Sequence, residues 1–107
     1  MNQKFIIGLA ALLLGPAAMS QDIAAGRSKA QSCAVCHGPV GLSSQADIPN
    51  LAGQPSLYLS AQLRAYRSGA RKHEVMSVMA KPLTDDEIVN LAAWFAAIKV
   101  EALPPAQ

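Results

Sequence analysis

Apolar residues recur at helical spacing between residues 55 and 69. Leu59, Leu63 and Tyr66 lie at positions i, i+4 and i+7, which is the pattern of one face of an α-helix. Pro55 is expected at the first position of this helix, where its missing N–H removes no hydrogen bond. Gly69 follows the last apolar residue and predicts the helix end, because glycine accepts the left-handed conformation found there.

The last helix has the clearest start. Residues 84–87 read Thr-Asp-Asp-Glu, which is a capping box with acidic side chains at the positive end of the helix dipole. One apolar face follows, formed by Ile88, Leu91, Ala92, Phe95 and Ile98. The pattern fades near Lys99, so the helix is expected to end there.

A shorter helix is predicted over residues 23–32, with Asp22 as its N-cap. Gly26 and Ala30 lie four residues apart, so they form a small-residue surface that another helix can approach closely. Residues 38–53 are rich in Gly and Pro and predict a loop. Because no segment of four to eight residues alternates cleanly, we expect an all-α fold with no sheet.

Residues 1–20 have the pattern of a cleaved signal peptide. Lys4 precedes a ten-residue apolar run at 5–14, which is too short to span a bilayer and has the length of a signal core. Small residues precede the expected cleavage after Ser20, so the domain is expected at 21–107. The alternative interpretation is an uncleaved N-terminal anchor.

Composition indicates a thin core. A chain of 107 residues with a formal charge of +2 is long enough for one domain and carries no nucleic-acid footprint. Aromatic residues make up 5% of the chain, and alanine dominates the apolar positions. We therefore expect a disulfide, a metal, a cofactor or a partner to complete the interior.

The motif with the most specific chemistry is Cys-Ala-Val-Cys-His at residues 33–37. This C-x-x-C-H spacing is typical of c-type haem attachment. At a helix end, Cys33 and Cys36 can reach the two vinyl-derived carbons on one edge of a porphyrin, and His37 can place its imidazole under the iron. The sequence therefore predicts one covalently bound haem c per chain, with His37 as proximal ligand.

Three other interpretations of this motif involve no haem. A structural zinc site needs four ligands, and only His73 could join the motif, which leaves one ligand missing. A thioredoxin-like redox pair is expected in a βαβ setting, whereas the pattern here is helical. A bare disulfide between Cys33 and Cys36 remains open for an exported chain.

Other motifs follow the haem motif in a characteristic order. They are Gly26 seven residues before it, Pro-Asn-Leu-Ala-Gly-Gln at 49–54, Arg71 before Met76, and Leu-Thr-Asp-Asp-Glu-Ile at 83–88 leading into the last helix. In this order the chain resembles small bacterial class I cytochromes c of the cytochrome c553/c4-like kind over residues 22–98. The resemblance implies the class I cytochrome c fold, in which short helices wrap around one covalently bound haem.

The resemblance also implies roles for residues around the haem. The carbonyl of Pro49 would accept a hydrogen bond from His37 Nδ1 and so fix the orientation of the imidazole. Leu51 would pack on the haem. Gly26 and Ala30 would cross the last helix.

A six-coordinate haem needs a second iron ligand, and only Met76 and Met79 of the mature chain can supply a thioether sulfur. His/Met ligation raises the reduction potential, because soft sulfur favours Fe(II). The resemblance implies Met76, eight residues before Thr84; Met79 is the alternative, and neither fits a helical stripe. His73 is expected at the surface, although a histidine there could compete for the iron. Arg71 is expected either to bond a haem propionate or to lie solvated.

The sequence therefore predicts a periplasmic one-electron carrier that cycles between Fe(II) and Fe(III) and has no catalytic residues. Its contacts with redox partner proteins would be weak and brief, with no nucleic acid and no transmembrane segment in the mature chain. A haem subunit held by a larger periplasmic oxidoreductase is the second hypothesis, and a sensor or peroxidase with an open distal position is the third. The basic residues that could form a docking face are Lys29, Arg64, Arg67, Arg71, Lys72 and Lys81.

Overall fold

The computed structural model describes residues 10–15 and 20–107. The helical elements are α1 (Ile23–Lys29), the 3₁₀ turn η1 (Ala30–Ser32), α2 (Ala34–His37), α3 (Ser56–Ser68), α4 (Met76–Ala80) and α5 (Asp85–Ala97). No strand occurs in these two ranges, so the all-α prediction is confirmed for them. None of the helices in the same ranges is long and apolar enough to cross a membrane.

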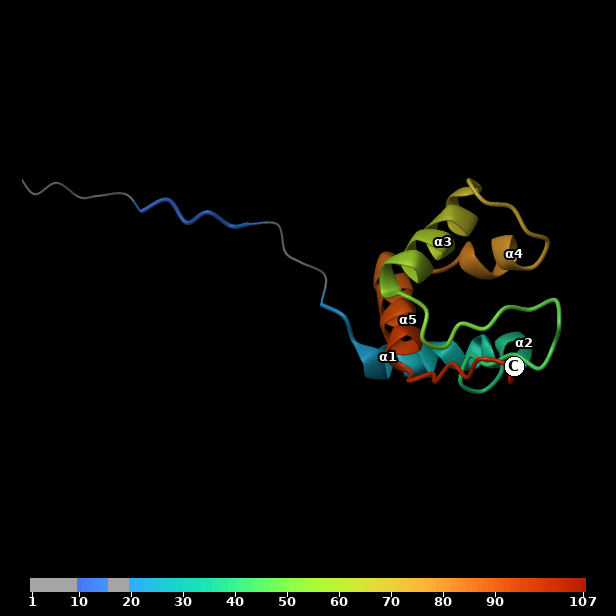
Figure 1. The fold of residues 1–107 in the computed structure, drawn as a ribbon. Coiled ribbons are helices and arrows are strands. Elements are labelled where there is room, and N and C mark those ends of the chain that lie inside the picture. The colour runs from blue at the N-terminus through green and yellow to red at the C-terminus, as the bar shows by residue number, and fades with distance from the viewer. Residues whose placement is uncertain (1–9, 16–19) are drawn as a thin grey trace, which may run out of the picture.

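The helices form two arms that meet at α5. Helix α5 packs against both α1 and α3, and α3 also packs against α4. Figure 1 shows α1 and α2 together on one arm and α3 and α4 on the other. The Cys-x-x-Cys-His motif and the two candidate methionines therefore lie on different arms.

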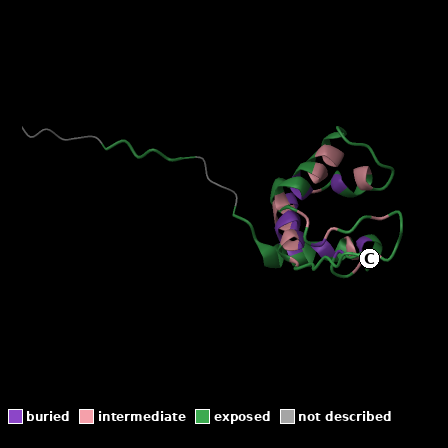
Figure 2. Cartoon of the chain, in the orientation of Figure 1, coloured by how far each residue is buried: buried purple, intermediate pink, exposed green. Residues whose placement is uncertain are grey.

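The buried part of the chain is small (Figure 2), and it consists largely of alanine. The buried hydrophobic residues are Ala30, Ala52, Leu59, Ala80, Ile88, Leu91, Ala92, Ala93 and Phe95. Among the residues that the structure describes, Ile88 is the one large side chain with less than 2% exposure. Because an alanine side chain buries little apolar area, the protein interior is as thin as the composition predicts.

Helices α1 and α5 cross at close range, with Gly26 of α1 next to the backbone of α5. A Cβ atom built on Gly26 would lie 2.0 Å from the backbone oxygen of Asn90, so the two helix backbones touch at this point. Asp22 caps α1 by accepting a hydrogen bond from the N–H of Ala25, and its own N–H donates to Asn90 Oδ1. Ala30 continues the contact as part of the buried cluster, so the predicted crossing is confirmed.

Helix α3 begins one residue later than the sequence predicts. Pro55 is its N-cap, with a ψ of 134° that lies outside the helical region. The first helical residue is Ser56, and the carbonyl of Pro55 accepts from the N–H of Leu59. Gly69 ends the helix in the left-handed conformation, with a φ of 84°, as predicted.

In the sequence, Met76 and Met79 have no place in a helical stripe, and no helix is predicted around them. Both lie in α4, which has only five residues. A helix of little more than one turn is too short to show an apolar periodicity in the sequence. Both methionines therefore lie on a short helix and not in an irregular loop.

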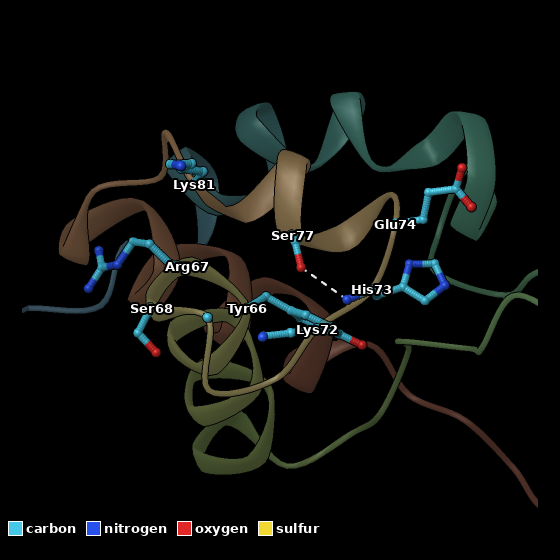
Figure 3. Close-up of a pocket in the computed structure, with 9 residues that line it drawn as sticks. Tyr66, Arg67, Ser68, Lys72, His73, Glu74, Ser77 and Lys81 are labelled. Atoms are coloured by element: carbon cyan, nitrogen blue, oxygen red, sulfur yellow. Dashed lines mark hydrogen bonds between the residues drawn. The ribbon is translucent and has the colours of Figure 1, made fainter.

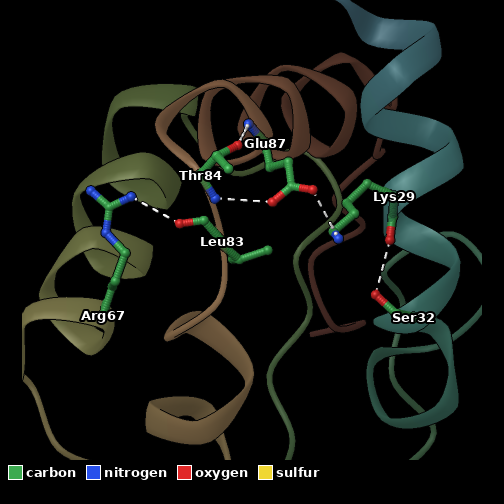
Figure 4. A network of polar contacts seen from close by, with 6 residues as sticks. All are labelled: Lys29, Ser32, Arg67, Leu83, Thr84 and Glu87. Carbon is green, nitrogen blue, oxygen red and sulfur yellow. Dashed lines mark hydrogen bonds and ion pairs between the residues drawn. The ribbon is translucent and has the colours of Figure 1, made fainter.

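The start of α5 is fixed by its capping box (Figure 4). Thr84 Oγ1 accepts from the N–H of Glu87 at 3.1 Å, and Glu87 Oε2 accepts from the N–H of Thr84 at 2.9 Å. The second oxygen of Glu87 pairs with Lys29 Nζ at 3.0 Å. The cap predicted from the sequence thus also joins α5 to α1.

A second tie joins the start of α5 to α3. Arg67 donates to the carbonyl oxygen of Leu83 at 3.0 Å and to Asp85 Oδ1 at 2.6 Å. Because the guanidinium is planar and carries several donors, it can hold a backbone oxygen and a carboxylate at the same time. The first turn of α5 is therefore held by both arms.

These ties predict an acid dependence of stability. The backbone hydrogen bond from Thr84 and the ion pair with Lys29 lower the pKa of Glu87, and the hydrogen bond from Arg67 lowers that of Asp85. A carboxyl whose pKa is lower in the folded than in the unfolded state adds stability above the unfolded value. That stability is lost as the pH falls through the folded value, so the free energy of unfolding should decrease on acidification.

The test is the Glu87→Gln variant, whose free energy of unfolding should depend less steeply on pH between neutral pH and about pH 3. Denaturant unfolding of the haem-containing protein across this range measures the slope. Glu101→Gln, in the exposed C-terminal segment, is the matched control and should keep the wild-type slope. Equal slopes for Glu87→Gln and wild type would contradict the prediction.

Candidate haem site

The thiols and the imidazole of the motif are carried by one short turn of helix. Cys33 is the N-cap of α2, and Cys36 and His37 are its last residues. Both cysteines are free thiols; Cys33 is half-buried and Cys36 is exposed. Burial raises the pKa of the Cys33 thiol, which keeps this group protonated near neutral pH.

The imidazole of His37 has one nitrogen in use and one free to bind. His37 is buried, and its Nδ1 lies 2.8 Å from the carbonyl oxygen of Pro49. A carbonyl oxygen only accepts hydrogen bonds, so Nδ1 carries the proton and donates it. The lone pair is then on Nε2, which is the arrangement that a metal-ligating histidine needs.

The loop that carries Pro49 is folded back by Gly41. The carbonyl of Gly41 accepts from the N–H groups of Leu51 and Ala52 at 2.8 and 3.0 Å. Gly41 has a φ of +78°, and a Cβ there would lie 2.9 Å from both Ala52 N and Phe95 Cδ1. A side chain at Gly41 would therefore push the loop away from α5 and move Pro49 away from His37.

Gly38 has a similar role directly after the motif. It ends α2 with a φ of +87°, and a Cβ on it would lie 2.0 Å from the carbonyl oxygen of Leu42. The sequence indicated both glycines only as loop residues. Gly38 had one further signal in the sequence. It follows His37 directly, where the chain must turn out of a four-residue helix.

Leu51 connects the loop to the core. It is partly buried and packs against the buried cluster that contains Leu59 and Phe95. Cys33 packs against the same cluster. Leu51 and one attachment cysteine therefore share this cluster, and the contact of Leu51 with a haem remains a prediction.

The two methionines differ in exposure. Met76 is half-buried at the start of α4, whereas Met79 is 42% exposed. Large apolar side chains are exposed in α4 and in the loop after α2; they are Val40, Leu42, Val75 and Val78. An apolar group held between the two arms would cover part of this surface, so the residues present fit a bound porphyrin.

Arg71 is held on α3. Its Nη1 donates to Gln62 Oε1 at 2.7 Å, and its guanidinium carbon lies 4.7 Å from the centre of the Tyr66 ring. The structure thus gives Arg71 two protein contacts on α3, and a bond to a haem propionate is not needed to hold it in place.

Two of the six basic residues are held in ion pairs. Lys29 is paired with Glu87 on the α1–α5 side, and Arg67 is paired with Asp85. Arg67, Lys72 and Lys81 line a pocket between α3 and α4 together with Tyr66, His73 and Ser77 (Figure 3). A docking face formed by all six residues remains a prediction.

Two thiols on one turn, an adjacent buried imidazole oriented through Nδ1 and an all-α frame with a thin core define a c-type haem protein. The chain belongs to the cytochrome c family: the family model described as Cytochrome c matches residues 23–99. This match favours haem attachment over the zinc, redox-pair and disulfide interpretations of the motif.

Relatives within the family include a thiosulfate dehydrogenase electron acceptor and a cytochrome c-554(548). The chain is 43% identical over 82 residues to the thiosulfate dehydrogenase electron acceptor of Thiomonas intermedia, covering 76% of this chain and 38% of that protein. It is 40% identical over 78 residues to cytochrome c-554(548) of Halomonas halodenitrificans, covering 70% and 94%. The chain thus spans well under half of one relative and nearly all of the other.

The fold agrees with a solved structure. Reduced cytochrome c4 from Pseudomonas stutzeri superimposes with a TM-score of 0.70 at 35% identity, over 75% of this chain and 47% of that one. The protein is therefore a small class I c-type cytochrome. As a member of this family it carries covalently bound haem c, with Cys33, Cys36 and His37 fitting the attachment motif.

Proposed function

We propose that this cytochrome carries single electrons in the periplasm, with His37 and Met76 as the axial ligands of its haem iron. The observation that carries the proposal is the hydrogen bond from His37 Nδ1 to Pro49, which leaves Nε2 as a buried, oriented ligand. The bound haem supplies the Fe(II)/Fe(III) couple. The protein supplies the attachment, the two ligands and a fixed ligand geometry, so that little rearrangement accompanies transfer.

Cys33 and Cys36 would hold the haem through two thioether bonds. Both thiols are free and lie at either end of one helical turn. Attachment there fixes the porphyrin edge relative to His37, since all three groups share the same short segment. Pro49 would set the plane of the imidazole, and Leu51 would pack on the porphyrin near Cys33.

Met76 is the better candidate for the distal ligand. It is half-buried, whereas Met79 is 42% exposed, and a thioether that binds iron must be shielded from solvent. The two residues are three apart on α4 and so lie on neighbouring positions of one helix face. Met79 therefore stays the alternative that the experiment below must exclude.

Export is proposed through a signal peptide at residues 1–20, cleaved after Ser20. Residues 1–9 and 16–19 of this segment lie outside the described residues. The proposal is supported by Leu12, Leu13 and Leu14, which are almost fully exposed and run away from the domain (Figure 1). Exposure of this described part of the apolar run is expected if the segment acts before folding.

The redox partners are proposed to be proteins that dock weakly, with a stable complex as the second candidate. The similarity to a thiosulfate dehydrogenase electron acceptor favours this second candidate. Size-exclusion chromatography of a native extract separates the two. A free carrier elutes as a small monomer, whereas a subunit elutes with a dehydrogenase.

The ligand assignment is tested with absorption spectra of oxidised wild type, Met76→Ala and Met79→Ala, each produced with a c-haem maturation system. Wild type and Met79→Ala should show the weak far-red band of Fe(III) bound to methionine sulfur, and Met76→Ala should lose it. Loss only in Met79→Ala would make Met79 the ligand. Absence of the band from haem-loaded wild type would reject His/Met ligation and favour the sensor or peroxidase hypothesis.

A further inference from the structure

The start of α4 is capped by a histidine. The backbone N–H groups of Val75 and Met76 both donate to Nδ1 of His73, at 3.1 and 3.2 Å. In return, Ser77 Oγ accepts from the backbone N–H of His73 at 3.0 Å (Figure 3). The N-cap residue of α4 is Val75, and these reciprocal hydrogen bonds from the residue two before it resemble those of a capping box.

The ring of His73 is itself anchored to α3. Its centre lies 6.5 Å from that of Tyr66 at an interplanar angle of 72°, an edge-to-face contact. Arg71 covers the Tyr66 ring, and its backbone N–H donates to the carbonyl oxygen of Ala65 at 3.0 Å. A continuous set of contacts therefore runs from α3 through Tyr66 and His73 to the backbone of Met76.

From these contacts we propose that His73 is a positioning residue for the Met76 sulfur. The first N–H groups of a helix have no acceptor within the helix. His73 satisfies two of them, one of which belongs to Met76, and holds that residue relative to α3. Without the imidazole this turn frays, and the Met76 thioether leaves the iron more readily. The inference rests on the proposed His37/Met76 ligation.

The geometry also explains why His73 is not expected to replace Met76 on the iron. Both of the N–H groups it accepts point at Nδ1, so this nitrogen is already occupied by α4. Moving the ring to bind iron would break both hydrogen bonds and the contact with Tyr66. The sequence-based expectation of a surface histidine is thus refined: His73 is exposed but has a defined structural partner.

The experiment measures how easily an added ligand displaces the methionine. Imidazole is titrated into the oxidised, haem-loaded protein while the far-red band is followed. His73→Ala should bind imidazole about fivefold more tightly than wild type, which is the factor that corresponds to a typical helix cap of about 1 kcal/mol. His73→Asn should fall between His73→Ala and wild type, because asparagine is a good capping residue but lacks the ring that contacts Tyr66.

Thr84→Ala is the matched control, since it removes the cap of α5, a helix that carries no proposed ligand. It should lower the midpoint of denaturation while leaving imidazole affinity unchanged. Ser77→Ala should shift the affinity in the same direction as His73→Ala and serves if that variant fails to fold.

Wild-type affinity in His73→Ala and Ser77→Ala, with the band present, would overturn the inference and leave the proposed ligation intact. An equal rise in imidazole affinity in Thr84→Ala would also overturn it, because the effect would then be general destabilisation. Absence of the band from wild type would instead reject the proposed ligation itself.

Discussion

Replacement of Gly26 by alanine is expected to lower the free energy of unfolding by about 3 kcal/mol, the upper range for overpacking a well-packed contact. The added Cβ would lie 2.0 Å from the backbone oxygen of Asn90 and 2.6 Å from its carbonyl carbon. These are backbone atoms of α5, so they cannot rotate away as a flexible side chain could. Relief requires α1 to move off α5, which separates the helices that enclose the core.

The sign of this effect is what makes the prediction specific. Alanine is favoured over glycine by about 1 kcal/mol in the interior of an exposed helix, and Gly26 lies within α1. Local propensity alone therefore predicts that Gly26→Ala stabilises the protein. The close crossing predicts the opposite, and guanidinium unfolding of the haem-loaded variant decides between them.

Gly69→Ala is the control for glycine replacement in general. A Cβ at Gly69 meets nothing within 4 Å, but its φ of +84° is unfavourable for a side chain. The expected cost is about 1 kcal/mol, from conformation alone. If Gly26→Ala destabilises no more than Gly69→Ala, the α1–α5 crossing is looser than described.

Much of this fold was accessible from the sequence because its longer helices carry local signals. Asp22, Thr84 and Gly69 each mark a helix end through their own side chain or backbone conformation. Helix α4 was missed because it has one turn and its cap is His73, a residue type that does not normally mark a helix start.

The haem site also has one part that the sequence predicts and another part that it does not. The attachment motif is contiguous, so its chemistry could be predicted from spacing alone. The contact between His37 and Pro49 joins residues twelve apart, and it was expected only through the resemblance to class I cytochromes c. The role of Gly41 depends on its approach to Phe95 of α5, and no local pattern reports such a distant contact.

Removal of the haem is expected to unfold the protein. Five of the nine buried hydrophobic residues are alanine, and among the described large side chains only Ile88 is less than 2% exposed. A group that binds only the folded state adds its binding free energy to stability, and under the proposed His37/Met76 ligation that group would also join the two arms. The expected loss is therefore the whole free energy of folding, of order 5 kcal/mol or more.

The haem-free chain is obtained by expressing residues 21–107 as Cys33→Ala/Cys36→Ala without haem maturation. Its far-UV circular dichroism should show little helix and no cooperative transition, whereas the haem-loaded wild type should show both. The double alanine change alone cannot account for such a loss, because Cys36 is exposed and Cys33 only half-buried. Adding free haem to the variant should restore part of the helix signal through His37. A cooperative transition in the haem-free chain would mean that the contacts of α5 with α1 and α3 suffice for folding, and that the alanine-rich core is more stable than its composition indicates.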